Sequence, residues 1–161
     1  MGKDKRFVLK GHAWSYAGIF LLFLLISFLL NWSLLIGENL MQYDIWDAEY
    51  PSQVLMSEAI SNHTLPLWNP LVRFGTPNYS VIGTPVWYFV TLILAWIGYT
   101  PATVAFSYAI HIAIGGFGMY LLAGQELGEN GQKTSGKQWA GFLVGLLYCC
   151  SGVFIGNAQH I

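Results

Sequence analysis

Residues 13–36 read AWSYAGIFLLFLLISFLLNWSLLI, and no formally charged residue lies between Lys10 and Glu38. As a helix this run covers roughly 36 Å, enough for a hydrocarbon core of about 30 Å. Aromatic residues stand near its ends, where amphipathic rings suit the interface, and the apolar stretch is longer than that of a signal peptide. We expect residues 13–36 to form a transmembrane helix that stays attached to the chain.

Basic residues are unevenly placed around this segment. Those before it are Lys3, Lys5, Arg6 and Lys10, and the only one after it, up to residue 100, is Arg73. Lysine and arginine favour the cytoplasmic side of a membrane. We therefore expect residues 1–12 to be a cytoplasmic tail and residues 37–100 to be a loop on the extracytoplasmic face.

The composition is that of a membrane protein with several spans. Apolar residues make up 55% of the chain, aromatic residues 16% and charged residues only 9%, whereas about a quarter of a soluble domain is charged. The net charge of −1, with basic residues clustered only in the N-terminal tail, argues against nucleic acid as a partner.

The uncharged stretch between Arg73 and Glu126 can hold one or two further spans. Residues 86–98 are bounded by proline turns and are in the length range of interfacial segments, whereas residues 101–123 cover about 34 Å as a helix. If only 101–123 crosses, the connector 124–138 with its two lysines is cytoplasmic, as the charge rule prefers; if both cross, it is outside. We favour the first arrangement, with 86–98 at the interface.

Residues 139–156 are the last apolar segment and should cross back, leaving 157–161 at the outer face. The expected fold is an all-α polytopic membrane protein with three spanning helices and an outer loop that contains short amphipathic or juxtamembrane helices. Glycine is frequent in the last two spans and allows close helix packing in lipid. We expect the three spans to be part of a larger helical bundle.

The loop 37–100 is too long to be a mere connector. Pro51 can occupy the first turn of a helix, and apolar residues at helical spacing follow it, so we expect a surface helix over about 51–61. Pro66 should prevent its continuation, and three proline turns come next. We expect a compact folded loop whose many aromatic residues suit either the membrane interface or a sugar-stacking surface.

Three carboxylates, Asp44, Asp47 and Glu49, lie shortly after the first expected span. They can coordinate a divalent ion, act as a general base on an acceptor hydroxyl, or only be solvated. The chain has no phosphate-binding glycine loop, no Gly-x-Ser-x-Gly and no His-Glu-x-x-His, so nucleotide, serine-hydrolase and zinc-protease functions lack support. Cys149 and Cys150 are adjacent in an apolar run and should be packing thiols.

Several further motifs occur in a fixed order along the chain. They are Asp44-x6-Pro51, Glu58-Ala59-Ile60, Leu65-Pro66-Leu67-Trp68-Asn69-Pro70, Phe74-Gly75-Thr76-Pro77, His111-x6-Gly118-Met119-Tyr120-Leu121-Leu122, and Ser151-Gly152-Val153-Phe154 followed by Gln159-His160. In this order they resemble the N-terminal portion of the YfhO-type bacterial membrane proteins. That family is similar to the GT-C glycosyltransferases, which use polyprenyl-phosphate-linked sugars on the outer face of the membrane.

The resemblance implies a glycosyltransferase of the bacterial cytoplasmic membrane that moves a sugar from a polyprenyl-phosphate carrier to a cell-envelope glycan acceptor. Asp44 occupies the place of the family's catalytic acidic residue, and we expect it to act as general base or orienting carboxylate on the acceptor hydroxyl. The candidate substrate-binding residues are Asp47, Glu49, Tyr50, Trp68, Asn69 and His160. Whether a divalent metal takes part stays open.

Two other functions compete with this expectation. A non-catalytic membrane scaffold or flippase partner in envelope assembly would use the outer loop to dock another protein. A transporter is disfavoured because the predicted spans contain no formally charged residue.

Overall fold

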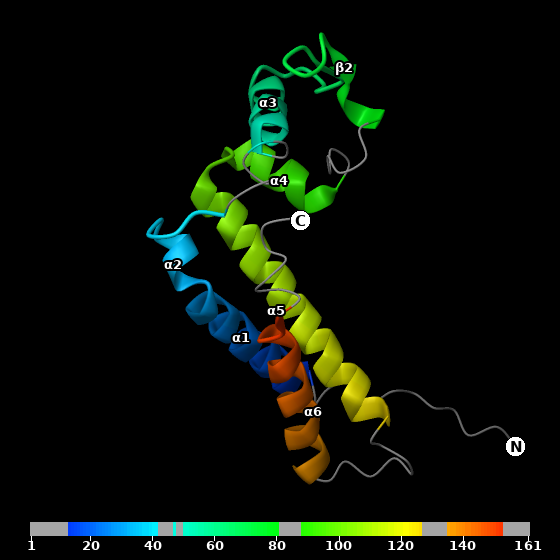
Figure 1. Ribbon diagram of the computed structural model, residues 1–161. Coiled ribbons are helices and arrows are strands. Elements are labelled where there is room, and N and C mark those ends of the chain that lie inside the picture. The colour runs from blue at the N-terminus through cyan, green and yellow to red at the C-terminus, as the bar shows by residue number, and fades with distance from the viewer. Residues whose placement is uncertain (1–12, 42–46, 48–49, 81–87, 127–134, 153–161) are drawn as a thin grey trace, which may run out of the picture. The chain divides into compact units, whose positions relative to one another are not determined.

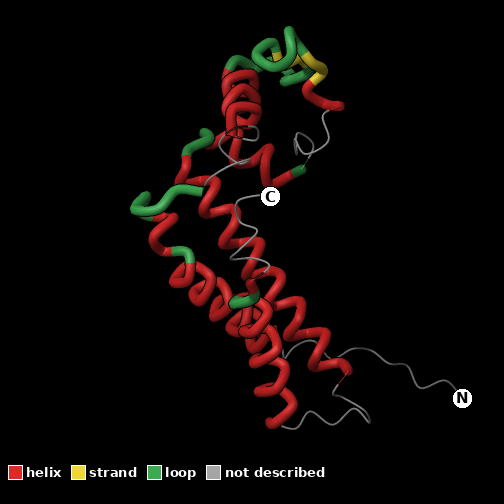
Figure 2. Tube along the Cα trace, in the orientation of Figure 1, coloured by secondary structure: helices red, strands yellow, loops and turns green. Residues whose placement is uncertain are grey.

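The computed structural model describes residues 13–41, 47, 50–80, 88–126 and 135–152. This part of the chain is mostly helical (Figures 1 and 2), which confirms the expected helical class. The helices are α1 (Ala13–Leu30), α2 (Trp32–Leu35), α3 (Tyr50–Ser61), α4 (Phe89–Ile97), α5 (Pro101–Glu126) and α6 (Ser135–Cys149). The remaining elements are the strands β1 (Trp68–Asn69) and β2 (Thr76–Pro77) and the 3₁₀-helix η2 (Asn78–Ser80).

The chain divides into two compact units. The first comprises Met1–Leu30 and Ile110–Cys150, and therefore contains α1, α6 and the later part of α5. The second comprises Asn31–Ala109 and Ser151–Ile161, and contains α2, α3, β1, β2, η2, α4 and the beginning of α5.

Glycines let the helices of the first unit approach closely. Gly116 of α5 and Gly145 of α6 are both buried, and a Cβ built on Gly145 would lie 2.5 Å from the carbonyl oxygen of Gly116. The ring of Phe23 on α1 fills the space beside both glycines, and Phe23 is fully buried. Helix–helix association in lipid relies on such small residues because backbones then pack directly.

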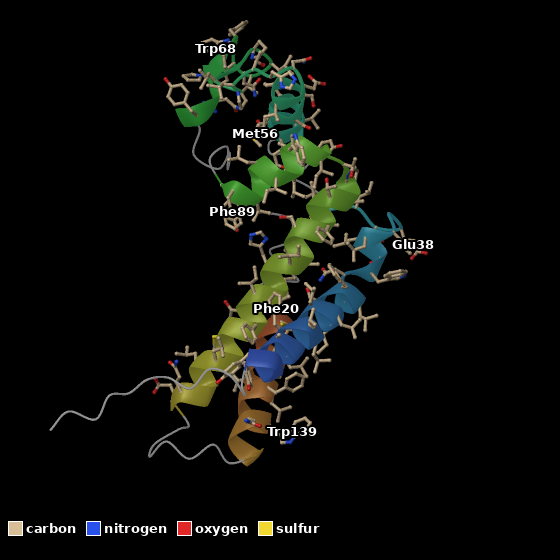
Figure 3. All side chains as sticks on the ribbon, turned by 180° about the vertical axis from the view of Figure 1, so that it is seen from behind. Phe20, Glu38, Met56, Trp68, Phe89 and Trp139 are labelled. Carbon is tan, nitrogen blue, oxygen red and sulfur yellow. The ribbon has the colours of Figure 1, made fainter. Side chains whose placement is uncertain are left out.

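Aromatic rings extend this contact along the first unit. Phe20 and Phe117 meet edge to face with centroids 5.4 Å apart, and Phe23 and Phe142 lie 5.2 Å apart. Phe20 is labelled on α1 in Figure 3. Edge-to-face and tilted aromatic pairs add to the free energy gained from burial alone. The three helices of this unit therefore pack through glycine backbones and aromatic side chains.

One expected span is present as a single long helix. Among the described residues, α5 alone is long and apolar enough to cross a membrane. It begins at Pro101, as expected, and extends three residues past the expected end at 123. Thr100 and Thr103 stabilise its start, because the Thr103 hydroxyl accepts a 2.8 Å hydrogen bond from the backbone N–H of Thr100.

The other two expected spans are shorter in the structure than in the sequence. Residues 13–36 divide at Asn31 into α1 and α2, because Asn31 has φ −105° and ψ 17° and its carbonyl accepts the backbone N–H groups of Leu34 and Leu35. Asparagine competes with helical hydrogen bonding through its own side chain. The helix expected over 139–156 begins earlier, at Ser135, and ends at Cys149. The three-span arrangement is therefore not confirmed.

In the second unit, α3 packs against α4. Met56 and Ala95 form the buried contact, with Ile60 and Tyr99 at its edge; Met56 is labelled in Figure 3. The structure has α3 where a surface helix over 51–61 was expected, and its end at Ser61 agrees with the stop signal at Pro66.

Helix α4 covers nine residues, or about 13 Å, within the expected segment 86–98. One side of it, with Thr91, Leu94 and Ala95, is buried. The other side exposes Phe89, Ile93 and Trp96, so α4 combines a packed face with an uncovered apolar face. Its length is that of an interfacial helix, and the interfacial location itself stays a prediction.

Candidate functional site

The predicted site residues are unevenly covered by the structure. Asp44, Glu49 and His160 lie outside the described residues. Asp47 is exposed, Tyr50 is the first residue of α3, and Trp68 and Asn69 form β1. The structure therefore describes the residues that flank the acidic segment in sequence, and the positions of Asp44 and Glu49 lie outside it.

A small hollow in the second unit is lined in part by the described residues that flank this acidic segment in sequence. Its empty volume, which includes space open to solvent, is about 290 Å³. Its lining residues are Leu34, Asn39, Leu40, Met41, Tyr50, Pro101, Val104 and Ala105. Met41 and Tyr50 are the described residues that directly precede and follow 42–49. Within that range only Asp47 is described. The described residues that flank the Asp44 segment in sequence thus both line the hollow.

The lining of the hollow is mostly apolar, and Met41 and Ala105 are its buried core. Asn39 and Tyr50 add an amide and a phenol. Ligand sites commonly combine an apolar wall with a few polar groups that fix orientation. The lining of this hollow has that composition.

Two of the loop motifs behind the family resemblance, Leu65–Pro70 and Phe74–Pro77, contain the two strands of one hairpin. Trp68 pairs with Pro77 and Asn69 pairs with Thr76 in an antiparallel ladder. We expected turns at these prolines but no strands, so the hairpin corrects the all-α expectation for this loop. Proline is tolerated here because a two-stranded ladder leaves one side of each strand unpaired.

Asn69 has a structural role in the hairpin. Its side-chain oxygen Oδ1 accepts a 2.9 Å hydrogen bond from the backbone N–H of Leu71, and the residue is 4% exposed. This Asx turn starts the reversal between the strands. A substrate contact of Asn69 stays a prediction, although its buried amide oxygen is already used.

Trp68, in contrast, is available to a ligand. It is 57% exposed, and Gly75 lies against its indole ring, because a Cβ on Gly75 would lie 2.5 Å from Cζ2 of Trp68. Figure 3 labels Trp68 on this hairpin. The glycine fixes the ring on one side and leaves the rest of its surface uncovered by described residues. Trp68 therefore presents an exposed aromatic ring, supported on one side, of the kind that can stack against a sugar.

The tip of the hairpin has an unusual backbone. Arg73, Phe74 and Gly75 have φ values of 50°, 65° and 106° in sequence. A left-handed conformation costs a non-glycine residue roughly 1–2 kcal/mol. The two strained residues direct their side chains outward, since both Arg73 and Phe74 are exposed. The tip thus displays one cation and one aromatic ring near Trp68.

Asn78 is the residue of this region that the sequence analysis missed. Its backbone N–H donates to the carbonyl oxygen of Leu67 at 2.9 Å, and its side-chain Nδ2 donates to that of Pro66 at 3.2 Å. It is 1% exposed and closes the base of the hairpin. In the sequence, the only sign of this structural role is the position of Asn78 directly after the Gly-Thr-Pro turn.

Metal binding receives no support from the part of the chain that is described. No group of three or more histidine, cysteine, aspartate or glutamate side chains there could hold an ion. The cluster of Asp44, Asp47 and Glu49 falls largely outside this part. No protein-family model, curated protein or solved structure matches the chain.

Proposed function

We propose that the chain is the N-terminal part of a GT-C-like membrane glycosyltransferase that transfers a sugar from a polyprenyl-phosphate carrier to an extracytoplasmic cell-envelope acceptor. The observation that carries the proposal is the hairpin, in which two of the loop motifs of the family resemblance meet. It belongs to the same compact unit as the hollow lined by Met41 and Tyr50, which flank the Asp44 segment in sequence. A shared unit is what a donor site and an acceptor surface require.

Asp44 is the proposed catalytic residue. As a carboxylate it takes the proton of the acceptor hydroxyl while that oxygen attacks the anomeric carbon, and the carrier phosphate leaves with the bonding electrons. General-base catalysis of this kind contributes about 10²- to 10⁴-fold. Asp47, Glu49 and Tyr50 are the proposed contacts to the donor. Trp68 is the proposed contact to the acceptor, a role that its exposed ring supports.

The membrane arrangement is part of the proposal. Helix α5 is the observed candidate span. With residues 13–36 and 139–156 as further spans, residues 1–12 and 124–138 are cytoplasmic and residues 37–100 are outside. The lipid carrier, the envelope acceptor and the remaining helices of the same protein are then the partners, in the bacterial cytoplasmic membrane.

The test is replacement of Asp44 by Asn in the full-length protein. Sugar transfer from a radiolabelled polyprenyl-phosphate sugar to the cell envelope should fall by about 10²-fold or more. Glu38→Gln is the matched control, because Glu38 is an exposed carboxylate of the same loop outside the proposed site, and it should retain transfer. Full transfer by the Asp44 variant would remove this residue from the chemistry.

A scaffold function remains the second candidate because the hairpin exposes apolar side chains. The most exposed are Leu65, Leu71 and Phe74, at 70%, 75% and 109%. Such a surface could dock another protein. Saturable binding of a polyprenyl-phosphate sugar by the purified full-length protein favours the transferase, since a docking scaffold needs no such ligand.

A further inference from the structure

Helix α4 is apolar at every position except Thr91, yet only one side of it is packed. The buried side carries Thr91, Leu94 and Ala95. The exposed positions of the helix are all apolar, and they are Phe89, Leu92, Ile93, Trp96 and Ile97. At about 100° per residue these five positions form one stripe about 140° wide, which we call the outer stripe. A helix that is apolar nearly all round needs cover on both sides.

Helix α3 supplies the cover on one side only. Met56 packs against Ala95 in a buried contact, whereas Trp96, the next residue, is 79% exposed. In Figure 3 the ring of the labelled Phe89 points away from α3. Helices shorter than about 12 residues are marginal in water even with good formers, and α4 has nine residues. The outer stripe therefore needs an apolar environment.

The chain holds α4 close to the candidate span. Four residue steps lead from Ile97 at the end of α4 to Pro101 at the start of α5, and an extended chain covers at most about 14 Å in four steps. In the proposed topology α5 crosses the membrane, so Pro101 lies near one boundary of the hydrocarbon core. Each polar zone of the bilayer is about 5–8 Å thick. The outer stripe is thus within reach of lipid.

The charge and the residue types of this region favour lipid over a docked protein. Residues 74–125 contain no aspartate, glutamate, lysine or arginine, whereas surfaces that dock proteins surround an apolar centre with a polar rim. Tyr88 and Trp96 are exposed near the two ends of α4, and these residue types are enriched where membrane meets water. Apolar burial, rather than attraction to anionic lipids, must then provide the binding free energy.

We propose that the outer stripe of α4 lies against lipid acyl chains at the membrane surface, while the opposite side of the helix carries α3. The inference rests on the membrane arrangement in the proposed function and not on the chemistry of Asp44. Helix α3 begins at Tyr50, which lines the same hollow as Pro101. The lipid contact of α4 therefore holds α3, and with it this flank of the acidic segment, at the level where the phosphate of a lipid carrier lies.

A fluorescent amino acid, introduced by stop-codon suppression, tests the contact in the full-length protein. It replaces Ile93 on the outer stripe, Glu58 on the exposed side of α3, or Ile114 at an exposed position of α5. The proteins are reconstituted in nanodiscs of phosphatidylcholine brominated on its acyl chains. We expect several-fold stronger quenching at position 93 than at 58, with 114 reporting the membrane location of α5. Position 89 repeats the measurement on the same stripe.

Acrylamide, a water-soluble quencher, separates the other occupants. Quenching of position 93 by acrylamide instead of bromolipid would overturn the proposal, because the stripe would then face water. Protection of position 93 from both quenchers would also overturn it, because a protein surface would then cover the stripe. If position 114 is still quenched by bromolipid, either failure leaves the membrane arrangement standing. Loss of quenching at 114 as well would refute that arrangement together with the lipid contact.

The lipid composition gives a second test. Replacing a third of the lipid by phosphatidylglycerol, brominated in the same way, should leave quenching at position 93 unchanged, since α4 contains no lysine or arginine. A requirement for the anionic lipid would contradict a contact made by apolar side chains alone.

Discussion

The hydroxyl of Ser57 donates a 2.6 Å hydrogen bond to the backbone carbonyl oxygen of Ala95, a residue 38 positions further along the chain. Both residues are buried. Ala95 lies in the last turn of α4, where carbonyl groups lack partners within their own helix. Ser57 thus satisfies an end of α4 and joins it to α3, next to the Met56–Ala95 contact.

Replacing Ser57 by Ala should weaken the α3–α4 pair. The carbonyl of Ala95 would stay buried without its partner, which costs about 1–3 kcal/mol in the free energy of unfolding. Denaturant titration of the full-length protein in detergent measures this loss. Ser61→Ala is the matched control, since Ser61 is exposed at the end of the same helix. Equal stability of the two variants would show that the Ser57 bond contributes nothing.

Two glycines of the first unit should respond to alanine with opposite signs. At Gly145 the new Cβ would lie 2.5 Å from the Gly116 carbonyl oxygen and 2.6 Å from Cζ of Phe23, whereas at Gly118 it meets no described atom within 4 Å. Overpacking costs typically about 1–3 kcal/mol, and alanine gains up to about 1 kcal/mol over glycine within a helix.

We therefore expect Gly145→Ala to lower the thermal midpoint of the purified protein and Gly118→Ala to leave it unchanged or raise it. Gly118 is the control for helix propensity, because α5 is a continuous helix on both sides of it. A rise for both variants would mean that α5 and α6 do not pack through glycine backbones.

The hairpin offers a second pair of glycines. Gly75 has φ +106° and lies against the Trp68 ring, whereas Gly37 has φ +78° and a Cβ built on it would meet no described atom within 4 Å. Alanine at Gly37 adds only backbone strain of roughly 1–2 kcal/mol. Alanine at Gly75 adds that strain and must also displace the indole.

Gly75→Ala should therefore accelerate trypsin cleavage after Arg73 by on the order of tenfold or more, because each 1.4 kcal/mol shifts the open population tenfold. Gly37→Ala should leave cleavage at Arg73 unchanged, since it lies outside the hairpin. Native-like cleavage in the Gly75 variant would contradict the close contact with Trp68.

The sequence predicted those helices whose borders have strong local signals. Pro101 after Gly98 marks the start of α5, and Pro51 and Pro66 bracket α3. The break at Asn31 was not predicted, because a single asparagine in the apolar run 13–36 does not by itself show that the helix is interrupted there.

The candidate site was predictable only in outline. Proline turns predicted a compact loop, but the pairing of Trp68 with Pro77 depends on a tertiary ladder of two residues per strand, too short for any periodicity. Asn78 matters through hydrogen bonds to residues 66 and 67, contacts that span the whole turn and leave no mark in local sequence.

Protease accessibility tests the proposed topology of the full chain in sealed vesicles. In right-side-out vesicles, added trypsin should cleave after Arg73 and not after Lys133, because residues 37–100 are proposed to be outside and residues 124–138 cytoplasmic. In inside-out vesicles the pattern should reverse, with Lys133 accessible and Arg73 protected, which controls for intrinsic susceptibility of the two sites. The physical basis is that four basic residues before the first span hold the N-terminus on the cytoplasmic side.

Cleavage of both sites from outside would mean that residues 86–98 cross the membrane as well, although α4 covers only nine of them as a helix. Cleavage of Arg73 from the cytoplasmic side alone would place the Asp44 segment away from any extracytoplasmic acceptor and would end the transferase proposal.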